Sequence, residues 1–145
     1  LSYSFRVREE DEWLNWIDGN ELAVYDLTQK IISFNMNWFR GRKHEVRLKS
    51  QFVALDAENP ISLISNSDGY LFNHTSDVKP FTQGIASFQI RYKYEIAPLS
   101  YIYAVYTKGG RVYDDENERN TSKVFKDPWN NPDNEIFSLK FRLKF

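Results

Sequence analysis

The chain has 145 residues, of which 19 are Lys or Arg and 20 are Asp or Glu, and its formal net charge is −1. A charge this close to zero excludes electrostatic attraction to nucleic acid as the main mode of binding. The chain has no cysteine, which excludes a disulfide framework and a thiolate metal site. Aromatic residues make up 17% of the chain, and no apolar run approaches the roughly 18 residues of a membrane helix, a combination that favours β structure and suits a transmembrane β-barrel.

Six segments alternate apolar and polar side chains with the two-residue period of a β-strand, so the sequence predicts an all-β fold of antiparallel strands. In the first segment, Tyr3 and Phe5 alternate with Ser4 and Arg6. The second and third segments are joined by a tight turn at residues 40–43. The predicted strands comprise residues 1–8, 22–39, 44–55, 84–97, 99–107 and 135–145.

The fourth and fifth segments differ in how clearly they alternate. In the fifth, Tyr101 and Tyr103 lie on one face and Ile102 and Ala104 on the other, so the sequence does not show which face meets water. The fourth segment shows this plainly, because basic and polar residues separate its apolar positions. These apolar positions are Ala86, Phe88, Ile90, Tyr92, Tyr94 and Ile96.

The C-terminal segment is strictly alternating and ends in an aromatic residue. Polar residues 138, 140, 142 and 144 separate its apolar residues. It resembles the closing-strand signal of bacterial outer-membrane barrels, in which a C-terminal Phe and alternate apolar residues are recognised by the barrel-assembly machinery. The resemblance assigns this role to Phe137, Leu139, Phe141, Leu143 and Phe145.

The predicted connections alternate between long and short. Long polar stretches at residues 9–21, 56–83 and 108–134 follow the odd-numbered strands, and short turns follow the others. Outer-membrane barrels have this pattern, with short periplasmic turns and long extracellular loops. Six strands are fewer than the roughly eight of the smallest single-chain barrels. We therefore expect the C-terminal six strands of a larger barrel, with the remaining strands supplied by upstream sequence or by another chain.

Charge is divided between the predicted loops and strands. Sixteen of the 20 acidic residues lie in the three long loops, and 13 of the 19 basic residues lie in the strands and the 40–43 turn. A positive inner wall could favour anion passage or hold an acidic plug. Alternatively, acidic residues on the missing strands could pair with it across the lumen. The predicted lumen-lining basic residues are Arg6, Arg8, Arg47, Lys49, Arg91, Lys93, Lys140 and Arg142, with Lys144 beside them, against Glu45 and Glu95.

The sequence contains no constellation that predicts catalysis. It lacks a nucleophile elbow, a phosphate loop and paired carboxylates, and neither of its 2 His residues has partners at metal-ligand spacing. We therefore expect no enzyme activity, no metal and no cofactor. Trp13 and Trp16 could stack on a sugar, but an interfacial or loop-packing role is the simpler expectation.

Three runs carry a narrower resemblance. Residues 42–49, 54–58 and 91–106 are similar to the C-terminal barrel region of a family of large, uncharacterised bacterial outer-membrane proteins, which also have an N-terminal module like family-nine carbohydrate-binding domains. The resemblance extends from about Phe34 onward. It implies a bacterial outer-membrane location, contact with outer-membrane lipid and a link to carbohydrate handling, but no established activity.

The sequence thus predicts part of an outer-membrane β-barrel that acts as a transport channel or as a component of a cell-envelope assembly. The alternative is a soluble all-β calyx that binds an apolar or sugar ligand. The two differ in which face meets water. In the barrel, the lipid contacts include Phe88, Ile90, Tyr92, Phe141 and Leu143, whereas a calyx would turn these residues inward.

Overall fold

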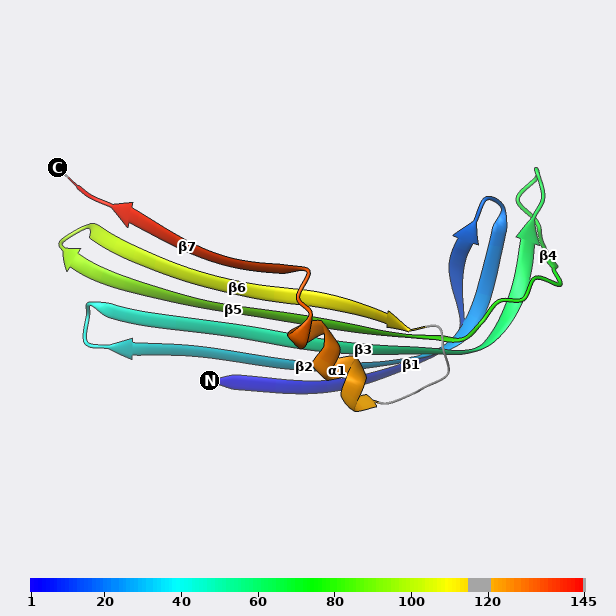
Figure 1. Cartoon of the computed structure of the whole chain (residues 1–145), viewed down its shortest axis with the longest axis horizontal. Helices are drawn as coiled ribbons and strands as arrows, with labels where there is room; N and C mark the ends of the chain where they lie inside the picture. The colour runs from blue at the N-terminus through cyan, green and yellow to red at the C-terminus, as the bar shows by residue number, and fades with distance from the viewer. Residues whose placement is uncertain (115–120, 145) are drawn as a thin grey trace.

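A computed structural model describes residues 1–114 and 121–144 as one open, antiparallel β-sheet with a single helix (Figure 1). The six long strands pair in the order β1-β2-β3-β5-β6-β7, and the short β4 pairs with β3. The predicted all-β antiparallel fold is confirmed, but the sheet does not close into a barrel. The elements are β1 (Ser2–Asp18), β2 (Glu21–Arg40), β3 (His44–Ser65), β4 (Leu71–Asn73), β5 (Phe81–Ala97), β6 (Ser100–Asp114), α1 (Thr121–Asn130) and β7 (Asn134–Arg142).

The register of the strands gives the sheet two chemically distinct faces. Directly opposite residues share a face, so the pairings of Leu48 with Ile90 and of Ile90 with Tyr106 extend a single apolar row across three strands. We call this side the apolar face. The neighbouring positions form the polar face, where Lys49 lies opposite Gln89 and Arg47 opposite Arg91.

Strands β1, β2, β3, β5 and β6 are longer than the sequence predicted, β7 ends at Arg142 before its predicted end, and the predicted long loop at residues 9–21 is wrong. Strand β1 continues to Asp18, and only Gly19 and Asn20 separate it from β2. Strand β3 likewise continues to Ser65, and β6 to Asp114. The strict alternation of long and short connections therefore fails at its first position. The polar segments form strands because they pair in register with β2, most of which the sequence predicted as a strand. Local composition does not reveal this pairing.

Register shifts disrupt the alternation where the strands pass beyond their predicted ends, and two of them contain a residue with positive φ. Glu12 lies in a register shift of β1 and has a φ of 57°, and Asn59 lies in one of β3 with a φ of 49°. The Asn59 Nδ2 donates a hydrogen bond to the Asp26 Oδ2 at 2.8 Å. Bulges bend strands, and beyond them the ends of β1, β2 and β3 turn away from the long axis of the sheet (Figure 1).

An aromatic core fills the bend. Tyr25 is 2% exposed, and its ring meets that of Phe81 edge-on with centroids 5.2 Å apart. Burial, assisted by the nearby Tyr113, raises the pKa of the Tyr25 hydroxyl. Trp13, which lies in β1 and not in the expected loop, packs against both rings and so has a structural role in this core. Trp16 is exposed and donates a hydrogen bond from Nε1 to its own turn. The buried members of this core are Ala23, Tyr25, Leu27, Ala57 and Phe81.

Helix α1, which lies in a predicted loop, crosses the apolar face and contacts β3, β5 and β6 (Figure 1). Its Trp129 meets the Phe88 ring edge-on at a centroid distance of 5.6 Å, and its Phe125 meets Phe52 at 6.5 Å. Phe88, a predicted lipid contact, therefore packs against the helix and is half-buried. The backbone of α1 lies so close to Gly84 and Gly110 that a Cβ at either would meet a helix carbonyl oxygen at 2.1–2.2 Å.

The two edges of the sheet are left open. Within the described ranges, β1 pairs only with β2 and β7 only with β6. An exposed strand edge is a row of unpaired backbone donors and acceptors that another strand can bind. Strand β7 ends on the side of the molecule where the turns after β2 and β5 lie (Figure 1). In the described part of the chain, no helix has the length and apolar character needed to cross a membrane.

Candidate functional site

Six cationic side chains gather on the polar face near the short turns. They lie on β3, β5 and β7, where the two-residue period directs them all to one side. The cross-strand register brings Arg47 opposite Arg91, and Tyr103 of β6 lies between Lys93 and Lys140. We call this surface the basic patch and define it as Arg47, Lys49, Arg91, Lys93, Lys140 and Arg142.

The other two predicted lumen-lining residues lie elsewhere. Arg6 and Arg8 belong to the same face, but the register places them opposite Ile31 and Gln29. These rows lie closer to the bend than the row of Lys49. Arg8 is also paired, because its Nη2 lies 2.6 Å from the Glu10 Oε2. The structure therefore brings together six of the eight predicted residues and separates two from them.

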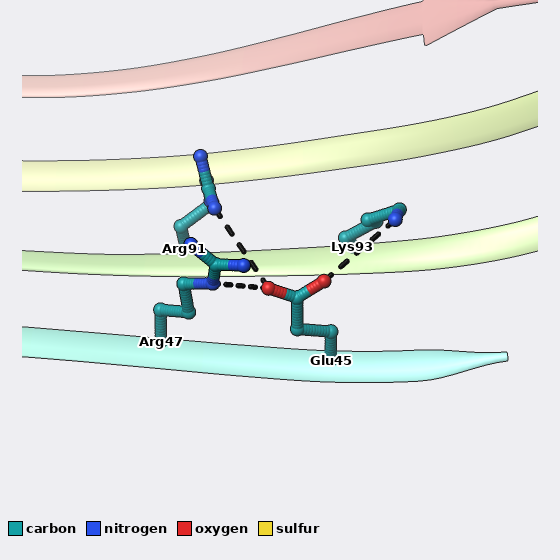
Figure 2. Close-up of polar contacts among 4 residues, drawn as sticks. All are labelled: Glu45, Arg47, Arg91 and Lys93. Carbon is teal, nitrogen blue, oxygen red and sulfur yellow. Dashed lines mark hydrogen bonds and ion pairs between the residues drawn. The ribbon is translucent and has the colours of Figure 1, made fainter. Parts of the chain in front are cut away.

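One carboxylate lies among the cations of the basic patch. Figure 2 shows Glu45 between Arg47, Arg91 and Lys93. Its Oε1 accepts a hydrogen bond from the Arg47 Nε and lies 3.8 Å from the Arg91 Nη2, and its Oε2 lies 3.7 Å from the Lys93 Nζ. The Glu45 side chain is only 12% exposed. Because like charges directly opposite each other destabilise a sheet, Glu45 offsets the repulsion between Arg47 and Arg91.

Two tyrosines flank the basic patch, and they resolve which side of β6 is polar. Tyr101 lies opposite Glu95 and Tyr103 opposite Lys93, so both belong to the polar face. The Lys93 Nζ lies 4.4 Å from the centroid of the Tyr101 ring, within cation–π range. The sequence left this assignment open, because β6 has large side chains on both faces.

The basic patch opens into two hollows that share Arg91. One is lined by Arg47, Lys49, Gln89 and Arg91. The other is lined by Arg91, Tyr103, Val105, Ser138, Lys140 and Arg142. Each hollow therefore presents at least three cationic side chains to whatever enters it.

A band of neutral polar side chains adjoins the patch on the side toward the bend. It lines a third hollow, which shares Lys49 and Gln89 with the hollow around Arg47 and Arg91. Hydroxyl and amide groups both donate and accept hydrogen bonds. We call this surface the polar strip and define it as Ser33, Asn35, Gln51, Ser87, Gln89 and Thr107.

The predicted closing-strand residues lie on the opposite face. Phe137, Leu139 and Phe141 pair in register with Tyr106, Ala104 and Ile102, and are 54–68% exposed. Leu143 follows the end of β7 and is 55% exposed. Phe145 lies outside the described residues. The apolar face of β7 is thus uncovered along its described length, as contact with lipid or with another element would require.

The chemistry of the site is that of anion binding. Arginine and lysine side chains donate charge-assisted hydrogen bonds to oxyanions, and the hollows expose several of them together. Among residues 1–114 and 121–144, no three His, Cys, Asp or Glu side chains are grouped so that they could hold a metal ion.

Helix α1 was not predicted from the sequence. The available signal was a pair of aromatic residues, Phe125 and Trp129, spaced four apart as on one face of a helix. Pro128 lies in the same segment and favoured a loop, because proline disrupts the interior of a helix.

Comparison with protein-family models, with curated proteins and with solved structures finds no match to this chain.

Proposed function

We propose that this chain is the C-terminal part of an outer-membrane β-barrel, with its apolar face toward lipid and its polar face toward the interior. The observation that carries the proposal is the separation of the two faces, which the register maintains across β2, β3, β5, β6 and β7. Exposed apolar side chains such as Phe137 and Leu139 lie on one face, and the basic patch lies on the other. A soluble protein rarely leaves so large an apolar surface exposed.

The dimensions of the apolar face support this orientation. On β5, this face runs from Ile96 to Phe88, where the contact with α1 begins. The eight residue-to-residue steps from Ile96 to Phe88 span about 27 Å along the strand, or roughly 21 Å along the axis of a barrel whose strands tilt by about 40°. Outer-membrane barrels have an apolar band about 25 Å tall. Helix α1 would then lie at the membrane–water interface.

The proposed role is transport across the outer membrane, or participation in a cell-envelope assembly linked to carbohydrate handling. The resemblance of residues 42–49, 54–58 and 91–106 to barrel regions of outer-membrane proteins supports this role. The three adjoining hollows of the polar face support a passage for hydrophilic molecules.

A soluble calyx is the second candidate. The observation in its favour is α1, which packs on the apolar face through Phe125 and Trp129. In a calyx, that face would enclose an apolar ligand and the basic patch would meet solvent.

Two neighbouring single-cysteine variants separate the candidates, because the natural chain has no cysteine. Gln89→Cys and Ile90→Cys place a thiol on opposite faces of β5. Each would be introduced into the full-length protein, labelled with a fluorophore and reconstituted in vesicles that contain brominated lipid. In the barrel, bromine quenches the label at position 90 much more strongly than the label at position 89.

Equal quenching at both positions, or stronger quenching at position 89, contradicts the proposed orientation. Extraction gives a second check. The barrel stays in the membrane pellet in carbonate and in high salt, whereas a calyx is released without detergent.

A further inference from the structure

We infer that the basic patch and the polar strip together bind an acidic saccharide, meaning a sugar that carries carboxylate, phosphate or sulfate groups. The inference rests on the proposed function, because it assigns a substrate class to the interior of the barrel. The juxtaposition that carries it is a surface of six cations bordering a surface of six neutral hydrogen-bonding side chains. Lys49 and Gln89 lie in hollows of both surfaces.

The cations provide the anion-binding half of the site. Glu45 contacts Arg47, Arg91 and Lys93, so a single carboxylate is shared among three cations. On β7, Lys140 and Arg142 line a hollow with Arg91, and among the described residues no carboxylate lines it. Arginine presents a planar fork of donors that matches a carboxylate or phosphate. The hollow around Arg91, Lys140 and Arg142 is therefore suited to one anionic group, and the hollow around Lys49 to a second.

The polar strip provides the hydroxyl-binding half. Its side chains end in hydroxyl or amide groups, and among the described residues that line its hollow Lys49 alone is charged. Such groups exchange hydrogen bonds with sugar hydroxyls in either direction. On the other side of Arg91, Tyr103 adds a phenolic hydroxyl beside Lys140.

Together, the basic patch and the polar strip restrict the class of ligand that fits the site. A simple inorganic anion would use the cations but none of the adjoining hydroxyl and amide groups. A neutral sugar would leave several cations of the basic patch without an anionic partner. A hydroxylated chain that bears repeated oxyanions uses both surfaces and their shared boundary at Lys49 and Gln89.

The test uses the full-length protein reconstituted in planar bilayers. Tetragalacturonate, which carries carboxylates, is compared with neutral maltotetraose, and sodium sulfate at matched ionic strength shows whether charge alone is enough. We expect tetragalacturonate to block the current at the lowest concentration. Phosphorylated and sulfated sugars distinguish which oxyanion binds most tightly.

Two variants and a matched control assign the effect to the site. Arg91→Gln and Lys140→Gln should each weaken block by tetragalacturonate about tenfold, because a hydrogen bond between charged groups contributes at least that factor. Arg8→Gln removes a cation from the same face but outside the basic patch, and should leave block unchanged. Calorimetry in detergent measures the affinity of the same three variants for tetragalacturonate and does not require conductance.

The outcomes separate the inference from the proposed function. Equal block by tetragalacturonate and maltotetraose, or by sulfate alone, overturns the saccharide inference and leaves the barrel intact. An unchanged affinity in Arg91→Gln and Lys140→Gln overturns it as well. Failure of the bromolipid experiment overturns the barrel, and calorimetry then shows whether the basic patch of a soluble protein still binds the saccharide.

Discussion

At the scale of single residues, the most informative side chain is Glu45. It is largely buried among cations, and it lies beside two arginines that face each other across β3 and β5. The carboxylate therefore has two effects. It reduces the repulsion that opposes this register, and it lowers the positive charge available to an anion in the hollows.

We predict that Glu45→Gln makes the protein less stable and the interior more attractive to anions. The loss of stability should be about 0.5–1 kcal/mol, because the partner side chains are exposed enough for water to screen them. The midpoint of urea unfolding measures the stability, and block by tetragalacturonate measures the second effect.

Glu95→Gln is the matched control for this prediction. Glu95 lies on the same face of β5, opposite Tyr101, and outside the ion pairs of Glu45. It should change stability much less than Glu45→Gln. The double variant Glu45→Gln/Arg91→Gln should recover much of the lost stability, because it removes one of the two opposed arginines. A double variant less stable than Glu45→Gln alone would argue against charge repulsion as the cause.

At the scale of secondary-structure elements, the position of α1 depends on two glycines of the sheet. The carbonyl oxygen of Pro128 lies where a Cβ at Gly110 would have to be, and Val124 has the same relation to Gly84. Any side chain at these positions would push the helix off the apolar face. The aromatic contacts of Phe125 and Trp129 would then be lost.

We predict that Gly110→Ala displaces α1 while leaving the sheet intact. The Cβ would approach the Pro128 oxygen to 2.2 Å, a backbone clash that no side-chain rotation relieves. The expected results are a red shift of tryptophan fluorescence as Trp129 becomes more exposed, and faster proteolysis within residues 121–130.

Gly109→Ala is the natural comparison, since it changes the adjacent residue of the same strand. Its Cβ would meet the Asn134 side chain at 3.3 Å and would not touch α1. Its fluorescence and proteolysis should match those of the unmodified protein. If both variants behave alike, the close packing of α1 on Gly110 is not what holds the helix in place.

At the scale of the whole molecule, the open sheet leaves two edges that further strands must pair with if the proposed barrel is to close. Strands β1 and β7 are edges, and their unpaired backbone groups cannot be left in hydrocarbon. Six long strands are also fewer than the roughly eight of the smallest outer-membrane barrels. The proposed barrel thus requires further strands at both edges, from the same polypeptide or from another copy.

We predict that the native, detergent-solubilised protein is larger than the 17.2 kDa of this chain. A denatured mass well above that value assigns the additional strands to the same polypeptide. A denatured mass near 17.2 kDa with a larger native mass assigns them to other chains. A monomer of 17.2 kDa in both states would contradict the barrel.

The features that depend on strand periodicity could be predicted from the sequence. The side on which Arg91 or Ile90 lies follows from its position in an alternating run, and neighbouring short turns set the pairing of β2 with β3 and of β5 with β6. All-β structure, antiparallel pairing and the two faces of the sheet could therefore be predicted. The alternating pattern also predicted that all six residues of the basic patch lie on the polar face.

The features that depend on contacts between distant segments are seen only in the folded chain. The bulges at Glu12 and Asn59 interrupt the period, so the strand extensions and the bend escaped prediction. The separation of Arg8 from the basic patch follows from the register between β1 and β2. Helix α1 packs where Gly110 lets its backbone approach the sheet. Local sequence encodes which way a side chain points, but packing and register across the sheet decide which side chains meet.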